Sequence, residues 1–489
     1  MVKILAYDLG ASSGRGIVGE LQNGILKLNE VHRFSNDPVM FNNHLQWDFL
    51  RFCHEIKQGL LKCKTGGYSD ISSLGVDTWG VDFGLLDDNG ELMSNPYHYR
   101  DDRTFGMIER CLKYISSEEL YSRTGIQIAP YNTIFQLLAM KINDDKTIEN
   151  ASTLLLMPDL INYMLSGKMV SEYTHVTTTG LYSHKKKDWD FEIMDKLGIP
   201  RRLFTKIVKP GTLLGKLKDS ICMELDIKPV SIIAVAGHDT GSAVAAVPAM
   251  DDSYVYISSG TWSLLGIESD EPITNSLALK YNFTNEGGIN NKIRFLKNIM
   301  GLWIIQECRR TWEKEGRKLS FSQMVDLARD EKKFMCFIDP DDELFYTPGN
   351  MPERVRKFCK DTNQPVPLSE GQIVRCVEES LAYKYRWSIE KVEEITSKKI
   401  DMIHMVGGGI QDELLCQLTA DATGRRVVAG PVEATAIGNI IVQAIVLGEI
   451  KDINQGREII RNSFEVKEYM PQNFDAWDNN YSRFLSILK

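Results

Sequence analysis

Two short segments of this chain combine small residues and hydroxyl groups in a way that could bind phosphate. The first runs from Asp8 to Arg15, where an apolar stretch ends in an acid and breaks into Gly, Ala and Ser before a second apolar run. A strand, a small-residue turn and a strand present backbone N–H groups and hydroxyls to an anion. The acid could then reach a magnesium ion on that phosphate. An ordinary tight hairpin uses the same residues, so this segment alone leaves both interpretations open.

The second segment repeats this arrangement in the other half of the chain. Residues 254–267 again form an apolar run, a turn of Ser, Gly and Thr at Ser258–Thr261, and a second apolar run. Because the arrangement recurs, we favour phosphate binding, and we expect a duplicated domain that holds a nucleotide between two hairpins. The chain has no Walker P-loop, since neither Gly-Lys pair, at Gly167 and Gly215, is followed by Ser or Thr.

Asp239 is the candidate general base. It follows the strongly apolar run Val230–Ala236 and begins a segment of small residues. A carboxylate at the rim of a strand can accept the proton of a substrate hydroxyl while that oxygen attacks phosphorus. The neighbouring His238 and Thr240 could contact a polyol. An Asp at the start of a helix is also an ordinary N-cap, and that interpretation remains open.

Three further places could bind a sugar or a nucleotide. Residues 75–83 mix acids with Trp79, which suits sugar hydroxyls and carbons, although the end of a core strand with solvated acids would look the same. The glycines 407–409 after a strand would let a flat ligand approach the backbone, and a simple tight turn is the alternative. Asn298 and Gln306 have amides able to bind a ligand, and Asn298 could equally be a helix cap.

The elements around these residues predict a mixed α/β sheet. Apolar patterning places strands at Lys3–Tyr7, Arg15–Leu21, Ile25–Phe34 and Ile71–Asp77, and a one-faced helix at Trp47–Cys63. Asn23-Gly24 is a strong hairpin signal, so the sheet begins antiparallel. Helix-linked strands then continue it as a mixed sheet.

The remainder of the chain is expected to be helical in its middle and to repeat the opening in its second half. The sequence pattern from Asp101 to about Leu225 predicts mostly helices. Further strands are expected at Val230–Ala236, Tyr254–Ile257, Trp262–Ile267, Met402–Val406 and Val427–Val428. The composition of Phe337–Gln372 predicts an irregular excursion on the surface. The pattern of Glu433–Leu447 predicts the final strong helix of the chain, which we expect to end at Gly448. The domain crossing is expected near Pro248.

Length and composition limit the class of protein. A chain of 489 residues is expected to form two domains, and a net charge of −9 argues against a nucleic-acid partner. The nine cysteines have no metal-type or CxxC spacing, which suits reduced thiols in a cytosol. We expect a cytoplasmic protein with no signal peptide and no membrane span. The oligomeric state is left open.

Together these segments resemble the FGGY family of carbohydrate kinases, and the resemblance covers nearly the whole chain. The motifs that carry it, in the family's order, are Asp8–Arg15, Gly75–Asp82, Tyr99–Thr104, Gly237–Gly241, Ser258–Trp262, Lys297–Trp303 and Val406–Gly409. The resemblance implies an α/β, actin-like ATPase fold of two ribonuclease-H-like domains around a central cleft. It implies that residues 1–247 bind the sugar and residues 248–489 bind ATP.

The resemblance also implies roles for individual residues. Asp239 would be the catalytic base, and Asp8 the metal-associated acid. The matching ATP positions are Ala11, Ser12, Ser13, Gly14, Arg15, Gly260, Thr261, Gln306 and Gly408. The matching sugar positions are Gly80, His238, Asp239, Thr240 and Asn298. The implied reaction uses ATP and Mg²⁺ to phosphorylate the C1 hydroxyl of the open-chain ketose L-rhamnulose, as a step of L-rhamnose catabolism.

Other functions stay possible at this point. A kinase of the same family could act on L-fuculose, xylulose or glycerol, since similar phosphate machinery serves them all. An actin-like nucleotide-binding protein without a sugar is a different class, and the sequence Gly-His-Asp-Thr at 237–240 argues against it by providing a base. A sugar-sensing repressor would need an N-terminal DNA-binding module, whereas this chain starts directly in strand-like sequence.

Overall fold

The computed structural model describes residues 1–251 and 253–488, which form two compact units. Unit 1 comprises Met1–Pro248, Glu268–Phe295 and Ala434–Phe464; unit 2 comprises Ala249–Ile267, Leu296–Glu433 and Glu465–Lys489. The chain therefore leaves unit 1 after Pro248 and returns to it twice. Because neither unit is one continuous segment, the division into residues 1–247 and 248–489 stays a prediction.

Unit 1 is built on a six-stranded mixed sheet. Its strands, in spatial order, are β13 (Thr212–Lys216), β14 (Ser231–Ala234), β6 (Ser73–Thr78), β1 (Val2–Leu9), β2 (Ser13–Gln22) and β3 (Ile25–Ser35). β1, β2 and β3 are antiparallel neighbours, and Asn23 and Gly24 have the positive φ angles that their hairpin requires. β6 pairs parallel with β1, and β14 pairs parallel with β6. The predicted antiparallel start of a mixed sheet is confirmed.

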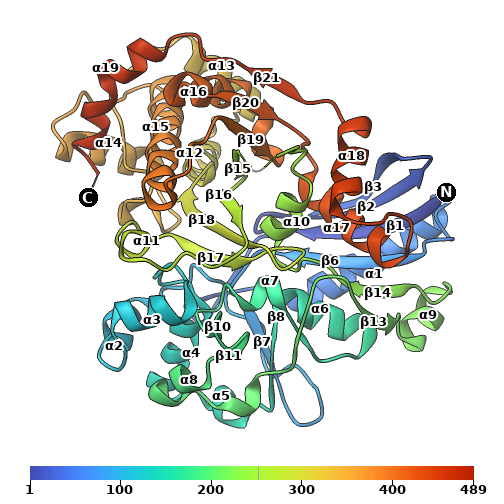
Figure 1. The fold of residues 1–489 in the computed structure, drawn as a ribbon. Coiled ribbons are helices and arrows are strands. Elements are labelled where there is room, and N and C mark those ends of the chain that lie inside the picture. Colours follow the sequence, from blue (N-terminus) through green and yellow to red (C-terminus); the bar gives the residue numbers. More distant parts are fainter. Residues whose placement is uncertain (252, 489) are drawn as a thin grey trace. The chain divides into compact units, whose positions relative to one another are not determined.

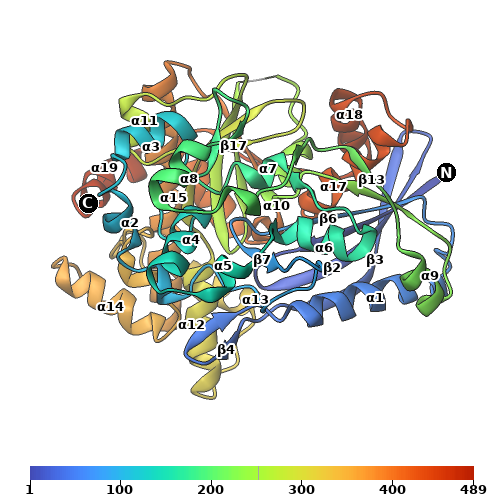
Figure 2. The ribbon, with the colours of Figure 1, turned by 90° about the horizontal axis from the view of Figure 1, so that it is seen from below.

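Helices cover both faces of this sheet (Figure 1), which explains why seven of the eight residues of β1 are buried. α10 (Asp239–Ala245) and α17 (Ala434–Val446) lie on one face, and α1 (Phe49–Thr65) and α6 (Met157–Ser166) lie on the other. Figure 2 shows α1 running along the sheet from below. The predicted helix at Trp47–Cys63 is confirmed as α1, and Asp48 caps it by accepting from the Arg51 N–H.

The middle of the chain adds short helices to unit 1, as its patterning predicts, and also small strand pairs, which its patterning does not predict. The helices are α2 (Met107–Cys111), α3 (Ser117–Thr124), α4 (Thr133–Ile142), α5 (Lys146–Asn150), α7 (Tyr173–Val176), α8 (Phe191–Leu197), α9 (Asp219–Leu225) and, from later segments, α11 (Ser276–Lys280) and α18 (Ile453–Ser463). The strand pairs are β4 (Val39–Phe41) with β5 (His44–Gln46), β7 (Phe83–Leu86) with β8 (Thr153–Leu156), β9 (Ser171–Glu172) with β12 (Ile207–Val208), and β10 (Tyr182–Ser183) with β11 (Asp188–Trp189). Buried side chains of α4, β8 and α8 form one hydrophobic cluster here.

Unit 2 contains most of a seven-stranded sheet. In spatial order its strands are β17 (Thr284–Gly287), β18 (Ile293–Met300), β16 (Trp262–Ser269), β15 (Tyr254–Ser259), β19 (Met402–Val406), β20 (Arg426–Ala429) and β21 (Lys467–Tyr469). β15 and β16 form an antiparallel hairpin, and β19 and β20 continue parallel to β15. The hairpin and the strands expected at Met402–Val406 and Val427–Val428 are confirmed. The chain passes between the units along β16 and β18.

The helices of the second half of the chain contradict two expectations, one about an irregular loop and one about the last strong helix. They are α12 (Trp303–Lys314), α13 (Phe321–Arg329), α14 (Met351–Asp361), the long α15 (Glu370–Thr396), α16 (Glu413–Thr423) and α19 (Phe474–Leu485). Phe337–Gln372 is not a surface excursion, because Phe337 is fully buried and α14 lies within the segment. Asn350 caps α14 and Pro352 stands in its first turn, a helix-start signal that the Pro content of the segment hid. Likewise α17 is not the final strong helix, because α18 and α19 follow it.

In the described part of the chain, no helix has both the length and the apolar composition needed to cross a bilayer.

Candidate active site

Three carboxylates of unit 1 come from the carboxyl ends of three neighbouring parallel strands. Asp8 lies near the end of β1, Asp77 near the end of β6, and Asp239 begins α10 after β14. Asp8 and Asp77 are partners in the β1–β6 register. The order β14–β6–β1 explains how the sheet gathers these acids at one edge. We call Asp8, Asp77 and Asp239 the carboxylate cluster.

Asp8 is held by the first hairpin. Arg15 stands opposite it in the β1–β2 register, and Arg15 Nη2 donates to Asp8 Oδ2 at 2.6 Å. The turn between them is closed by a hydrogen bond of 3.0 Å from Gly10 N to Ser13 O. Ser12 is exposed at its tip. The structure thus brings Asp8 and the hairpin residues 11–15 together, as the motif predicts.

Gly14 has a packing role that the motif does not reveal. A Cβ atom at this position would lie 2.2 Å from Cζ of the Phe34 ring on β3. The ring occupies the space that a side chain would need, so only glycine fits here. The requirement for Gly14 is therefore explained by Phe34, whatever ligand the hairpin binds.

Asp77 is the site residue that the sequence did not single out as a ligand. Asn439 Nδ2, on α17, donates to Asp77 Oδ2 at 2.6 Å, whereas Oδ1 is buried and has no hydrogen-bond partner among the described residues. Burial, with the Asp8 carboxylate as the next cause, raises the pKa of Asp77 well above its ordinary value. A buried oxygen with nothing to bind marks this carboxylate as a ligand position.

Asp239 occupies the first position of α10, directly after the cap residue His238. Its Oδ1 accepts from Thr240 N at 2.5 Å and from Thr240 Oγ1 at 3.1 Å. It is therefore not the N-cap of the helix, since that place belongs to His238. The side chain keeps 28% of its surface exposed, so a substrate hydroxyl can reach it. Burial raises the pKa of Asp239, His238 lowers it, and the charge of Asp8 raises it.

A buried ion pair between Arg294 and Glu286 holds the His238 ring on the side of Nδ1. Arg294 Nη2 lies 3.1 Å from His238 Nδ1 and 3.1 Å from Glu286 Oε2, and Arg294 is fully buried. His238 Nδ1 also lies 3.1 Å from Glu286 Oε2, so the guanidinium and the carboxylate together hold this side of the ring. Nε2 lies 3.5 Å from Asp239 Oδ1, on the side of the base. The sequence motif contained His238 but gave no sign of Glu286 or Arg294.

Gly80 lies beside the same imidazole, since a Cβ at this position would stand 3.4 Å from His238 Nε2. The structure therefore brings together four of the five expected sugar positions: Gly80, His238, Asp239 and Thr240. The fifth, Asn298, lies half-buried on β18 in unit 2. It is not a helix cap, because α12 begins five residues later, so that alternative is wrong.

Glu172 holds the backbone that precedes Asp239. Its Oε2 accepts from Gly237 N at 2.9 Å and from Thr174 Oγ1 at 2.5 Å, and Thr174 Oγ1 in turn accepts from His238 N at 3.1 Å. Burial raises the pKa of Glu172 to about 7 despite these donors. This carboxylate lies 65 residues from Gly237 in the sequence, so no local pattern could have identified it.

Asp82 has a structural role rather than the sugar-binding or solvated one considered for residues 75–83. Its Oδ2 accepts from Trp47 Nε1 at 2.7 Å and from Trp79 Nε1 at 2.9 Å, and its Oδ1 accepts from Gln136 Nε2 at 2.9 Å. The two indoles pack against each other with centroids 3.9 Å apart and planes tilted by 34°. Burial raises the pKa of Asp82 to about 6.

In unit 2, the turn of the second hairpin is joined to the start of α12. Gly260 N donates to Trp262 O at 2.9 Å, and Trp303 N donates to Thr261 O at 3.0 Å. Thr261 Oγ1 also lies 3.3 Å from Gln306 Oε1 on α12. Three expected ATP positions, Gly260, Thr261 and Gln306, are thus neighbours within this unit.

The triple glycine lies against the same hairpin. A Cβ on Gly409 would stand 2.2 Å from Ser259 Oγ, and Gly407 has φ of 90° and would place its Cβ 2.9 Å from Ser259 O. By contrast, a Cβ on Gly408 would meet nothing within 4 Å. Two of the glycines are therefore required by packing, and the middle one borders open space. Ser259 Oγ is buried and has no hydrogen-bond partner in the described residues.

The donor set of unit 1 fits a magnesium ion. Mg²⁺ prefers hard oxygen ligands and is usually held by one or two carboxylates together with substrate phosphates. The carboxylate cluster supplies such oxygens, and Asp77 Oδ1 in particular accepts no hydrogen bond from any residue that the structure describes. A divalent cation would also relieve the mutual repulsion that raises the pKa of Asp77.

Comparison with known proteins gives consistent matches along the chain. The model of the FGGY family of carbohydrate kinases, N-terminal domain, matches residues 3–246, and the C-terminal domain model matches residues 255–447. A rhamnulokinase of Oceanobacillus iheyensis is 46% identical over 95% of this chain and 97% of its own length. Rhamnulokinases of Bacteroides thetaiotaomicron (43%, covering 99% of both chains) and Bacillus subtilis (41%, covering 96% of both) are also similar.

Solved structures match in fold at much lower identity. A ligand-bound xylulose kinase of Lactobacillus acidophilus has a TM-score of 0.83 at 16% identity, covering 100% of this chain and 98% of its own. A Plasmodium falciparum glycerol kinase with ADP has a TM-score of 0.79 at 14% identity, covering 99% and 97%. The expected α/β, actin-like fold of ribonuclease-H-like domains is confirmed.

Proposed function

This chain belongs to the FGGY family of carbohydrate kinases, and from that membership we propose that it transfers the γ-phosphoryl group of ATP to the C1 hydroxyl of L-rhamnulose. The choice of ketose rests on the relatives named rhamnulokinase, which are 41–46% identical over almost their whole length. L-Rhamnulose 1-phosphate would be the product, in a catabolic route for L-rhamnose. We place the reaction in the cytoplasm, since the enzyme needs the compartment that supplies ATP.

The observation that carries the proposal is the position of Asp239. It stands at the start of α10, is partly exposed, and lies beside Asp8, whose charge raises its pKa. Asp239 would accept the proton of the C1 hydroxyl as that oxygen attacks phosphorus. A positioned base of this kind is worth roughly 10²–10⁴-fold in rate. His238, Thr240 and Gly80 would contact the sugar, as would Asn298.

The phosphates would be bound by two sets of residues, one in each unit. In unit 1, the amides and hydroxyls of residues 11–14, with Arg15, would orient the phosphates. In unit 2, Gly260, Thr261, Gln306 and Gly408 would bind the nucleotide, with Gly408 closest to it because it borders open space. Magnesium, held by Asp8 with Asp77, would neutralise phosphate charge during transfer. In this proposal residues 1–247 act mainly on the sugar and residues 248–489 on ATP.

The test is ADP release with Mg²⁺ and ATP, measured across L-rhamnulose, L-fuculose, L-xylulose, D-xylulose, D-fructose and glycerol. We expect a clear preference for L-rhamnulose and a product whose phosphorus couples to C1 in NMR. Asp239→Asn should lower kcat by roughly 10²-fold or more while ATP still binds. Asp251→Asn, an exposed acid outside the carboxylate cluster, is the matched control.

Three other results would each overturn a different part of the proposal. Preference for another ketose would keep the base and overturn the substrate. Near-normal turnover by Asp239→Asn would overturn the base. ATP hydrolysis that ignores every sugar and yields no sugar phosphate would overturn the transfer reaction.

A further inference from the structure

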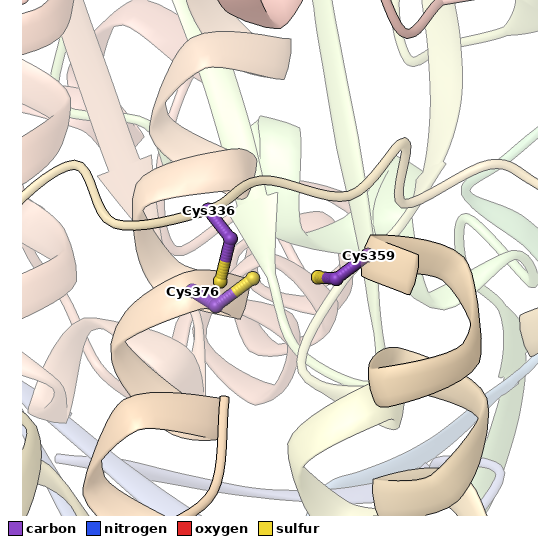
Figure 3. Close-up of side chains that lie close together, drawn as sticks. All are labelled: Cys336, Cys359 and Cys376. Carbon is purple, nitrogen blue, oxygen red and sulfur yellow. The ribbon is translucent and has the colours of Figure 1, made fainter. Parts of the chain in front are cut away.

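Three of the nine cysteines gather in unit 2, and none of them is a residue assigned to catalysis or to ligand binding. The sulfur atoms of Cys336, Cys359 and Cys376 all lie within 4.8 Å of one another, and all three side chains are buried. Figure 3 shows the three sulfurs pointing toward a common place. We call these residues the thiol triad. No local sequence pattern indicates it, because the spacings are 23 and 17 residues.

The triad joins three separate elements. Cys359 lies on α14 and Cys376 on α15, while Cys336 lies in the extended segment that follows α13. A buried cysteine on its own behaves as a small hydrophobic residue, as Cys308 does on α12. Three sulfurs converging from three elements are a different arrangement, because together they offer a complete set of soft ligands.

Hydrogen bonds of the backbone set the spacing between the segment of Cys336 and α15. Ile338 N, two residues after Cys336, donates to Ser380 Oγ at 2.9 Å. Ser380 Oγ donates to Cys376 O at 2.6 Å. The backbone carrying one thiol is therefore bound through a single hydroxyl to the backbone carrying another.

A second link runs from the same segment to α14. Gln364 Oε1 accepts from Phe337 N at 2.9 Å, and Gln364 Nε2 donates to Phe337 O at 2.8 Å. Gln364 N donates to Cys359 O at 2.8 Å. Neither link involves a sulfur atom, so the fold positions the three thiols before anything binds them.

Positive charge lies beside the triad. Arg483 donates from Nη1 to Phe334 O at 2.9 Å and from Nη2 to Met335 O at 3.3 Å, which are the two residues before Cys336. A guanidinium at this place favours thiolate over thiol, and thiolate is the form that binds metal.

We propose that Cys336, Cys359 and Cys376 bind one soft metal ion of the Cu(I) type through three thiolates. Soft sulfur ligands select soft ions. Structural zinc is almost always held by four ligands, and in the described residues no fourth His, Cys, Asp or Glu joins this group. Three sulfurs within 4.8 Å suit trigonal coordination with metal–sulfur bonds of about 2.3 Å after a small contraction. Each thiol that binds gives up its proton to solvent.

The experiment titrates the full chain, reduced and under anaerobic conditions, with Cu(I) in competition with a chromogenic chelator. The expected result is one tightly bound Cu(I) per chain, with ultraviolet charge-transfer absorption from sulfur and a rise in the melting temperature. Cys336→Ala and Cys376→Ala should each lose tight binding. Cys308→Ala, which removes an equally buried lone cysteine of the same unit, should keep it. Sugar-dependent ADP release and melting curves in the absence of metal establish that each variant is folded.

Three outcomes would overturn the proposal. One is a reduced wild-type protein that fails to compete for Cu(I), a measurement that does not depend on any variant. Another is tight binding that survives Cys336→Ala, Cys336→Ser and Cys376→Ala. The third is tight binding of Zn(II) with none of Cu(I), which would require a fourth ligand.

Discussion

Asn439 Nδ2 donates a hydrogen bond of 2.6 Å to Asp77 Oδ2, although 362 positions separate the two residues. The amide comes from α17, in the last segment of the chain that returns to unit 1. It satisfies one oxygen of a fully buried carboxylate and leaves the other without a partner in the described structure. The fold thus holds a buried carboxyl group beside Asp8, which raises the pKa of Asp77, costs stability when that group ionises, and suits a cation.

We expect Asp77→Asn to stabilise the protein while reducing its activity. Because burial and Asp8 raise the folded-state pKa of Asp77, the folded state holds its proton more tightly than the unfolded state. The unfolding free energy of the wild type therefore falls as pH rises from the ordinary Asp pKa through the raised value. The variant should melt higher at pH 8, by roughly 2–4 °C for each kcal/mol regained.

The control for this prediction is pH itself. Below about pH 3 the carboxyl is protonated in both states, so the difference in melting temperature between wild type and Asp77→Asn should no longer change with pH. A variant that is less stable than the wild type at pH 8, measured without Mg²⁺, would contradict the assigned charge.

Asp8→Asn should raise the Mg²⁺ concentration that gives half-maximal activity. The change removes one hard oxygen ligand and also the partner of Arg15, whose Nη2 lies 2.6 Å from Asp8 Oδ2. Initial rates over a Mg²⁺ series at saturating ATP measure the effect, with Asp70→Asn, an exposed acid, as the control. An unchanged Mg²⁺ dependence would remove Asp8 from the metal site.

The support of His238 should be visible in the pH profile of sugar phosphorylation. In Arg294→Lys, one ammonium replaces a guanidinium that lies within hydrogen-bond distance of His238 Nδ1 and donates to Gly287 O. We expect kcat/KM for the sugar to fall about tenfold, which corresponds to about 1.4 kcal/mol, with KM for ATP unchanged. Because His238 lowers the pKa of Asp239, a misplaced ring should move the acid limb of the profile to higher pH.

Arg457→Lys is the control, since the Arg457 side chain is largely buried and its Nη2 lies 2.6 Å from Glu268 Oε2 in the same unit. If Arg294→Lys lowers the melting temperature but leaves the acid limb of the pH profile in place, Arg294 has only a structural role.

Much of the site could be predicted because its strongest signals are local. The strand and turn at residues 8–15, the hairpin at Asn23-Gly24 and the order of the motifs lie within short windows of sequence. The supporting residues could not be predicted in this way. Asp77 depends on Asn439, Gly237 on Glu172, and His238 on Glu286 and Arg294, and each pair is joined only by the fold.

The errors in the fold have a similar physical origin. Phe337–Gln372 is rich in Pro, Asp and Gly, so its composition suggested an exposed loop, whereas Phe337, Val355 and Cys359 are fully buried. What decides burial here is packing, of Phe337 against Tyr383 on the long helix α15 and of α14 against α12, which composition cannot report. The thiol triad could not be predicted for the same reason, because only the packing of the fold brings its three cysteines together.

Glu172 should link stability to pH in the neutral range. Its pKa is raised to about 7, so the unfolding free energy should fall as pH rises from about 4.3 to about 7, by at most about 1.4 kcal/mol per pH unit. Glu172→Gln should make this slope shallower by the share of one group, while Asp77 and Asp82, whose pKa values are also raised, keep their shares. It should also cost about 1–3 kcal/mol above pH 7, because the new amide would face an N–H or O–H donor.

The measurement is urea unfolding at pH 5, 6, 7 and 8, followed by kcat for the sugar at pH 8. We expect kcat to fall severalfold, since Gly237 and His238 lose their anchor. Glu224→Gln, on the exposed surface of unit 1, should leave both the slope and kcat unchanged. A slope in Glu172→Gln that is as steep as in the wild type would assign the titration to other groups.

Gly408 and Gly409 form a matched pair that separates nucleotide binding from packing. A Cβ on Gly408 would meet nothing within 4 Å, so Gly408→Ala should melt within about 1 °C of the wild type while KM for ATP rises severalfold. A Cβ on Gly409 would stand 2.2 Å from Ser259 Oγ, so Gly409→Ala should lower the melting temperature clearly. Adding Ser259→Ala should restore part of that loss, because it removes the atom that clashes. If Gly408→Ala changes stability and leaves KM for ATP alone, the open space beside Gly408 does not bind the nucleotide.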